Sequence, residues 1–441
     1  MRRLLLLLLL PLLLGALLQL VASHEPFRVI FEWKTVNVSW PSEELRVHSI
    51  NHKWYIPANH PVAGIKLWKG KMYLTFPRWK EGVPFTLGVT SATPIKNITD
   101  PKVEAYPNWD MQKVGDCRAF QFVQSMEIDP KGRMWVLDTG RTETLTLAAK
   151  SRCPPRLVIL DLEDEGKVLR SYNFPSTVTP PESSYLNDIV LDHEDGGLAY
   201  ISDNGKDDPG IIVYSLRNNT SWKVRHESMK AKPEAVSFMV KSTRIVSPIN
   251  VDGIALSPAS AKNRTLYYSP LSSFNLFSLP VSVLKDSELS KNVDSYVRDL
   301  GRKISQTDGM AMSAKGVLYF GLLADDAVAM WDSLSSPSFN NGQRTISRDH
   351  FLMQWPDTFA FDEDGNIWCI SNSLQNFLTN QVNPNVTNYR AIRSKAMSKS
   401  YQYLEDGSSP ILPDIEAGAD ARMSSFALAS SLALLLLFIA K

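Results

Sequence analysis

The stretch Thr307-Asp308-Gly309-Met310-Ala311-Met312-Ser313, followed after a turn at Gly316 by Leu318-Tyr319-Phe320-Gly321, decides the fold of this chain. It contains two short apolar runs that a turn joins, which is the pattern of a β-hairpin. Four more stretches along the chain repeat it: they begin at Ser125, Leu186, Val251 and Asp357, and each contains Asp, Ser or Gly residues between its apolar runs. A weaker copy begins at Val62.

The copies begin roughly 50–65 residues apart, a spacing typical of propeller blades or solenoid units. Four-stranded blades that close into a ring around a central channel leave no long exposed sheet edge. A WD-type propeller is a poor alternative, because Trp331-Asp332 is the only such dipeptide and the period is too long. We therefore predict an all-β fold, a six-bladed β-propeller over residues 24–393, in which residues 29–33 supply a strand that closes the ring. Helical periodicity is scarce.

Both ends of the chain carry apolar segments. Residues 1–23 read as a secretory signal peptide, with Arg2-Arg3, an apolar run and a small-residue cleavage site at residues 21–23. Residues 394–425 are predicted to form a polar stalk with little order, and residues 426–441 form a hydrophobic tail. Small residues, a spacer and such a tail fit a glycolipid (GPI) signal, with Gly418, between Ala417 and Ala419, as the attachment point. A spanning membrane anchor and a merely hydrophobic tail are the alternatives.

Other features agree with secretion to the cell surface. N-glycosylation sequons occur at Asn37, Asn97, Asn218, Asn219, Asn263 and Asn385. Of the three cysteines, Cys117 and Cys153 are expected to form a disulfide, whereas Cys369 lies in an apolar run and is expected to be a buried thiol. The formal net charge is +1 and no basic run occurs, which argues against nucleic acid as a partner.

Several motifs resemble those of the yellow/major royal jelly protein family of secreted, largely arthropod proteins. The resemblance covers the mature domain and rests on these stretches: Phe31-Glu32-Trp33-Lys34, Phe76-Pro77-Arg78-Trp79, Gly115-Asp116-Cys117, Met134-Trp135-Val136-Leu137-Asp138-Thr139-Gly140 and Ser371-Asn372. It implies a six-bladed propeller with a ligand site at one mouth of its channel. Similar proteins in insect saliva bind serotonin and catecholamines. Others act in melanin formation, are reported to convert dopachrome, or serve as nutrients or in egg coats.

The sequence departs from that family in two ways. The family usually has four cysteines in two bridges, so the missing partner of Cys369 puts the second bridge in doubt. A GPI-like tail is also unusual in the family, and it suggests a product attached to the cell surface.

Residues at the start of each innermost strand face the axis of a propeller, so their side chains should gather at one mouth. In this chain the candidate ligand-binding residues are Asn187, Asp188, Asp252, Asp308, Asp357 and Thr358, with Asn372 from a neighbouring strand end. A ring of acids favours a protonated amine or a metal ion, and an amine also needs an aromatic wall. Phe377, Phe359 and Tyr106 are the candidates for that wall. The alternative role for each Asp is a structural one, capping turns or bonding the backbone amides of neighbouring blades.

We expect a small aromatic biogenic amine or a catechol-type molecule as the ligand and no cofactor. The first enzymatic alternative is dopachrome conversion, for which the sequence identifies no base. The second is a calcium-dependent lactonase-like hydrolase, whose metal would need acid and Asn ligands from several blades. The third alternative is a structural surface protein with an empty channel.

Overall fold

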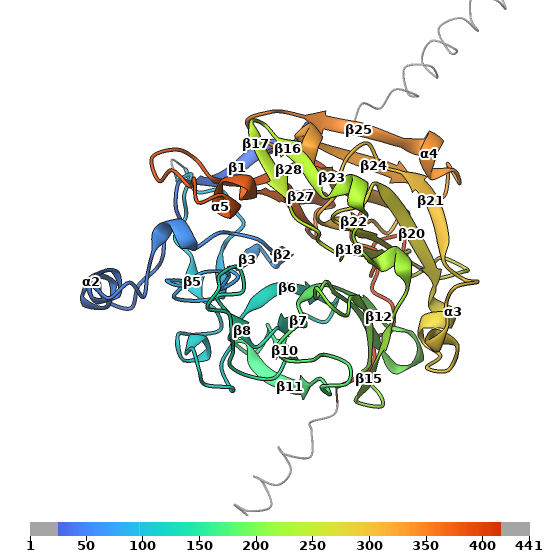
Figure 1. Ribbon diagram of the computed structural model, residues 1–441, viewed down its shortest axis with the longest axis horizontal. Helices are drawn as coiled ribbons and strands as arrows, with labels where there is room; N and C mark the ends of the chain where they lie inside the picture. Colours follow the sequence, from blue (N-terminus) through green and yellow to red (C-terminus); the bar gives the residue numbers. More distant parts are fainter. Residues whose placement is uncertain (1–24, 97, 416–441) are drawn as a thin grey trace, which may run out of the picture.

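The computed structural model describes residues 25–96 and 98–415 of the chain. Six four-stranded antiparallel sheets are arranged around a central channel, which confirms the predicted six-bladed β-propeller (Figure 1). The first strands of neighbouring blades contact one another, so the first strand of each blade is the innermost. The expected signal peptide, Asn97 and the tail with Gly418 lie outside the described residues.

The blades are numbered in chain order. Blade 1 contains β2 (Ile65–Trp68), β3 (Lys71–Thr75), β4 (Leu87–Ser91) and β5 (Glu104–Ala105). Blade 2 contains β6 (Val123–Ile128), β7 (Arg133–Asp138), β10 (Arg156–Asp161) and β11 (Lys167–Asn173). Blade 3 contains β12 (Leu186–Asp192), β13 (Leu198–Asp203), β14 (Gly210–Ser215) and β15 (Thr220–Val224).

Blade 4 contains β18 (Val251–Leu256), β19 (Thr265–Pro270), β20 (Asn275–Pro280) and β21 (Arg298–Arg302). Blade 5 contains β22 (Met310–Met312), β23 (Val317–Leu322), β24 (Ala327–Asp332) and β25 (Gln343–Arg348). Blade 6 contains β26 (Pro356–Phe361), β27 (Asn366–Ser371), β28 (Tyr389–Lys395) and β1 (Arg28–Trp33). Two small hairpins lie outside the blades, β8–β9 (Arg141–Thr142 and Lys150–Ser151) and β16–β17 (Ser237–Val240 and Thr243–Val246).

Strand β1 closes the ring, as predicted. It pairs antiparallel with β28, so the last blade is built from both ends of the propeller. Phe31 and Trp33 of β1 are each 1% exposed and pack in the hydrophobic layer between blade 6 and blade 1. Similar apolar layers fill the space between the other blades, so the core of the domain is distributed around the ring.

The Asp-Gly pairs of the repeat have a steric cause. A Cβ atom on Gly253 would lie 2.2 Å from the carbonyl oxygen of Asp308, and one on Gly309 would lie 2.3 Å from that of Asp357. Both distances are far below van der Waals contact, so only glycine lets the innermost strands approach this closely. The glycine thus brings the acid that precedes it next to the acid of the following blade.

Helices are few and short in the part of the chain that the structure describes. They are α2 (Glu43–Asn51), α3 (Val281–Leu284), α4 (Phe339–Gly342) and α5 (Leu374–Leu378). The 3-10 turns are η1 (Pro57–Asn59), η2 (Asp110–Gln112), η3 (Glu194–Gly196), η4 (Glu227–Met229), η5 (Pro233–Ala235), η6 (Leu289–Lys291) and η7 (Leu323–Asp325). Helix α2, which periodicity did not reveal, begins where the side chain of Ser42 accepts a hydrogen bond from the amide of Leu45, and it projects from the rim of the ring (Figure 1). Within the described residues, no helix has the length and apolar character needed to cross a membrane.

The segment expected to begin a stalk at residue 394 is instead part of the folded domain as far as residue 415. Strand β28 continues to Lys395, and the chain then crosses one end of the channel. Tyr401 is 4% exposed there; its backbone amide donates to Met312 and its hydroxyl accepts a hydrogen bond from the amide of Leu191. The segment places Tyr401 and Tyr403 at the channel end, and two aromatic residues in a polar stretch are too weak a signal to separate it from a linker.

Candidate functional site

A cavity of about 450 Å³ occupies the other mouth of the channel. Its floor contains Asn187, Asp252, Asp308 and Asp357, which come from blades 3 to 6 and lie far apart in the sequence. Its wall and rim include Trp79, Gln124, Arg141, Glu182, Tyr185, Asn204, Lys206, Asp207, Trp355, Leu374 and Leu378. The structure therefore brings together four of the polar residues that the sequence placed at the mouth.

Asp252 and Asp308 form the centre of the floor and share a hydrogen bond between their carboxyl groups. Asp252 also accepts hydrogen bonds from the side-chain amides of Asn187 and of Asn204, the latter at 3.3 Å. The Trp355 indole donates to Asp308 Oδ2 at 2.6 Å. These donors fix the orientation of both carboxyl groups.

Asp357 lies beside this pair and is held from blade 6. The side-chain amide of Asn372 donates to Asp357 Oδ2 and to the carbonyl oxygen of Val62, the latter at 3.0 Å. Asn372 is 1% exposed and is not among the residues that line the cavity. Its place is below the surface, where it positions Asp357.

Asp188 and Thr358 lie deeper, around a void of about 20 Å³ beneath the cavity. Asp188 Oδ2 accepts a hydrogen bond from the backbone amide of Ile254 in the neighbouring blade at 3.1 Å, and Oδ1 accepts one from the hydroxyl of Ser125 at 3.2 Å. The structural alternative considered for these acids thus describes Asp188, which links blade 3 to blade 4.

Three aromatic side chains that the sequence pattern did not assign to the site form its wall. The hydroxyl of Tyr185 accepts a hydrogen bond from the Trp79 indole and donates to Gln124 Oε1 at 2.9 Å. Trp355 is fully buried, and its backbone has a positive φ of 56°, a conformation that is strained for a bulky residue. A sequence signal existed for Trp79, which lies in the family-like stretch of residues 76–79, and for Trp355, which directly precedes the Pro356-Asp357 start of a repeat.

The aromatic residues expected to form the wall lie elsewhere. Phe377 is 1% exposed and packs behind Trp79, with 5.5 Å between the ring centroids, and it does not line the cavity. Phe359 belongs to the layer between blades 5 and 6, and Tyr106 packs against Tyr73 in the layer between blades 1 and 2. The sequence pattern marks these residues as apolar but does not give the direction in which a loop or strand end presents them.

Burial governs the protonation of the floor. It raises the pKa of Asp308 to about 6, although the hydrogen bond from Trp355 opposes the shift. The pKa of Asp252 and that of Asp357 are also raised well above the ordinary value, by burial first and then by the neighbouring charge of Asp308. The nearby charges that act on these three groups are other carboxylates, so a cation that entered the cavity would favour the ionised forms that burial disfavours.

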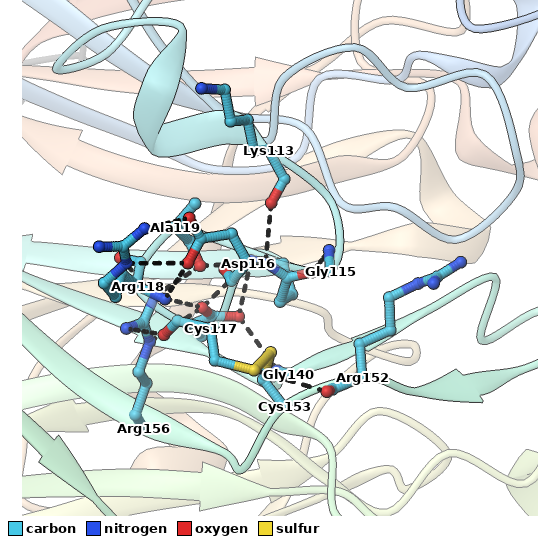
Figure 2. The surroundings of a disulfide bond; sticks show 12 residues. Lys113, Gly115, Asp116, Cys117, Arg118, Ala119, Gly140, Arg152, Cys153 and Arg156 are labelled. Atoms are coloured by element: carbon cyan, nitrogen blue, oxygen red, sulfur yellow. Dashed lines mark hydrogen bonds and ion pairs between the residues drawn. A yellow bond between two sulfur atoms is a disulfide. The ribbon is translucent and has the colours of Figure 1, made fainter.

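The disulfide between Cys117 and Cys153 is present, as predicted (Figure 2). Neither cysteine lines the cavity at the channel mouth. It connects the loop before β6 to the segment before β10. Cys369 is a fully buried free thiol whose pKa is raised by burial, in agreement with the prediction.

No group of three or more His, Cys, Asp and Glu residues suited to a metal ion occurs in the part of the chain that the structure describes.

Comparisons with known proteins give the following matches. The family model described as Major royal jelly protein matches residues 121–401. The chain is 28% identical to Dopaminechrome tautomerase of Drosophila melanogaster, in a match that covers 85% of this chain and 83% of that protein. It is 29% identical to Protein yellow of Drosophila subobscura and of Drosophila melanogaster, over 82% of this chain and 64% and 67% of those proteins. Among solved structures, a luciferin-regenerating enzyme matches 81% of this chain and 98% of its own, with 11% identity and a TM-score of 0.47.

Proposed function

Since the chain belongs to the major royal jelly protein family, we propose that it binds a small aromatic amine or catechol-type molecule in the cavity at the channel mouth. One observation carries this proposal: Asp252, Asp308 and Asp357 form the floor of a cavity of about 450 Å³ whose wall contains Trp79, Tyr185 and Trp355. The volume lies in the range of small-molecule sites.

The chemistry of the cavity suits a planar cation. A protonated amine at the floor would favour the ionised forms of the three carboxyl groups, which burial and their mutual proximity disfavour in the empty cavity. An aromatic ring above it would contact the indole of Trp79 and the phenol of Tyr185, and cation–π contact adds roughly 1 kcal/mol. The side-chain oxygen of Gln124 and the amide of Asn187 supply an acceptor and a donor for ring hydroxyls.

Calorimetry with serotonin and dopamine tests this function directly. We expect one site per chain, and we expect the Asp308→Asn variant to bind about tenfold or more weakly because one carboxylate of the floor becomes neutral. Asp294→Asn is the matched control, since the side chain of Asp294 is 80% exposed and lies in the segment before β21. Absence of binding for both amines, or equal affinity of the Asp308 and Asp294 variants, would contradict the proposal.

A second candidate function is the tautomerisation of an aminochrome. Two observations favour it: the hydrogen-bonded Asp252–Asp308 pair and the similarity to a protein named Dopaminechrome tautomerase. In such a reaction a carboxylate takes a proton from a ring carbon, and a carboxylic acid gives a proton to the carbonyl oxygen, so that no oxidant is consumed. Asp308, whose pKa is raised to about 6 by burial, suits the base. Asp252, whose pKa is raised by burial and by the neighbouring carboxylates and which shares a hydrogen bond with Asp308, suits the acid.

Loss of the coloured aminochrome in a spectrophotometer separates the two functions. Turnover that falls at least a hundredfold in both Asp308→Asn and Asp252→Asn, but not in Asp294→Asn, supports an enzyme. Saturable binding of the aminochrome without loss of colour supports a binding protein.

We also propose that the chain is secreted, glycosylated and held at the outer cell surface, with a role in pigmentation or development. The disulfide supports an oxidising compartment, and Asn218, Asn219, Asn263 and Asn385 are exposed. Asn37 is less suited to a glycan, because its side chain is half-buried and donates to the carbonyl oxygen of Asp100 at 3.0 Å. A mass decrease on enzymatic deglycosylation and release from cells by a phosphatidylinositol-specific phospholipase test the two modifications; unchanged mass and retention on the cells would contradict them.

A further inference from the structure

A second and larger cavity, of about 1110 Å³, lies outside the channel. It lies between helix α2 and the loops that follow β3, β5 and β7, and we call it the α2 cavity. The residues that carry the argument are Trp40, Trp54 and Trp109, with the basic residues Lys53, Arg78, Lys80, Lys113, Lys150 and Arg152. The proposed function does not use this cavity.

The base of the α2 cavity is rigid. Arg78 is 3% exposed, and its guanidinium donates to the backbone carbonyl oxygens of Gln112, Phe120 and Gln121 at 2.7–2.8 Å. Buried hydrogen bonds of this kind join the loop after β3 to the loop before β6. The floor therefore exists before any ligand arrives.

The disulfide fixes a wall of the same cavity. Asp116 and Arg152, each next to one of the bonded cysteines, both line the α2 cavity (Figure 2). A cross-link between these two loops restricts their separation in the folded protein. The disulfide thus restrains two loops that line this cavity.

Indole rings provide flat apolar surfaces in the cavity. Trp40 and Trp109 are stacked, with ring centroids 5.3 Å apart, and both are half-buried. Trp54 is 59% exposed, which is unusual for so large an apolar side chain, and it lies beside the rings of His48 and His52. Such rings can stack on the apolar face of a sugar ring as well as on an aromatic ligand.

The charge of the lining is predominantly positive. Six basic residues line the cavity against three acidic ones, Glu81, Asp116 and Glu143. Some of these charges are already paired: Asp116 with Arg118 at 3.0 Å, and Glu143 with Lys150, one of the six bases, at 2.9 Å. Lys113 pairs with Asp110, which is outside the lining, at 2.8 Å. The ammonium group of Lys80 bonds the carbonyl oxygen of Phe377 and the side chain of Asn380, and no carboxylate partner for Lys53 or Lys80 is found within the described ranges.

Size and exposure distinguish between ligands. The α2 cavity, at about 1110 Å³, lies at the upper end of the volumes of small-molecule sites, about 300–1000 Å³, so it has room for a ligand larger than a single aromatic ring. The exposed Trp54 and the exposed side chain of Lys113 show that the cavity is open along one side, which suits a chain molecule of several rings. We propose that the α2 cavity binds an acidic oligosaccharide, one that carries sulfate or uronate groups on its sugar rings.

Calorimetry on the full-length chain tests this site, with a heparin octasaccharide and a galacturonate octasaccharide as acidic probes and cellohexaose as the neutral one. We expect at least one acidic probe to bind with an affinity that falls as salt rises from about 50 to about 200 mM, and cellohexaose to bind at least tenfold more weakly. The Trp54→Ala variant should lose about tenfold in affinity, and Lys53→Gln about threefold. Both side chains are exposed, so both variants should fold, and circular dichroism checks this.

Lys262→Gln is the matched control, because Lys262 is an exposed loop lysine on the segment between β18 and β19. The affinity of this variant for the acidic probes should equal that of the wild type. The proposal would be overturned if Lys262→Gln weakened the binding as much as Lys53→Gln does. It would also be overturned if cellohexaose bound as tightly as the acidic probes, or if neither acidic probe bound. Asp308→Asn should leave this binding unchanged, so failure here and failure at the channel mouth are distinguishable.

Discussion

Replacing Asp308 by Asn is expected to stabilise the protein while it weakens binding at the channel mouth. The Asn side chain keeps the shape of Asp and retains an oxygen that accepts the hydrogen bond from Trp355. What it removes is a buried carboxyl group whose negative form is unfavourable in the folded protein. The two effects therefore have opposite signs, which a general structural defect would not produce.

The magnitude follows from the shift in protonation. Burial raises the pKa of Asp308 from an ordinary 3.8 to about 6 in the folded chain. The folded state then binds the proton more tightly than the unfolded state, so this group lowers the free energy of unfolding as pH rises between about 4 and 6. Two pKa units correspond to about 3 kcal/mol, a gain that the Asp308→Asn variant should show above about pH 6 and lose below about pH 4.

The neighbours of Asp308 act in the same direction. Asp252 and Asp357 would each lose the neighbouring charge of Asp308, which raises their pKa in the wild type. The charge of Asp188, which raises the pKa of Asp308 in the wild type, would no longer face an ionisable group at that position. Arg141, Lys206, Glu182 and Asp207 lie on the rim of the cavity and do not change in the variant.

Thermal unfolding at about pH 7.5 and at about pH 4, together with amine calorimetry at the higher pH, measures both effects. We expect the variant to melt roughly 4 °C higher than the wild type at the higher pH, with a gap that closes at the lower one. A variant that is less stable than the wild type at the higher pH, or a stability gap that is independent of pH, would refute the electrostatic reasoning.

Three further changes test other parts of the structure by thermal or urea unfolding. Gly309→Ala should destabilise the ring by about 3 kcal/mol, because the new Cβ would lie 2.3 Å from the Asp357 carbonyl oxygen. Replacing both bonded cysteines, Cys117 and Cys153, by Ser should cost about 3–4 kcal/mol, since the disulfide closes a loop across 36 residues of sequence. Tyr401→Phe should cost about 1–2 kcal/mol, because the amide of Leu191 would lose its 2.7 Å partner at the closed end of the channel. Each of these three has a control. Gly115→Ala should lower the free energy of unfolding by only about 1 kcal/mol, from the positive φ of this residue, because no atom lies within 4 Å of the position that its Cβ would take. If Gly309→Ala lowered the free energy of unfolding by no more than Gly115→Ala does, the steric argument would be contradicted. Chemical reduction of the wild type should reproduce the cysteine variant, and Cys369 should resist alkylation until the chain unfolds. Loss of binding at the open mouth in Tyr401→Phe would contradict its placement at the opposite end.

The sequence predicted the local and repeated parts of this protein. Alternating apolar runs and turn residues define a hairpin by themselves, and six copies at a regular spacing predict blades, because both signals need only near neighbours in the chain. The repeat also marks the acids Asp252, Asp308 and Asp357, since each occupies the same place at the start of an innermost strand.

Tertiary structure decided which aromatic side chains surround those acids and what the polar C-terminal segment does. Trp79, Tyr185 and Trp355 leave from loops or strand ends, where no period fixes the direction of a side chain, so only ring closure placed them at one mouth. In the same way, Tyr401 fills the far end of the channel through contacts with Met312 and Leu191, which are distant in the sequence, and no local pattern encodes such contacts. The protonation of the floor likewise depends on burial and on charges from separate blades, and these exist only in the closed propeller.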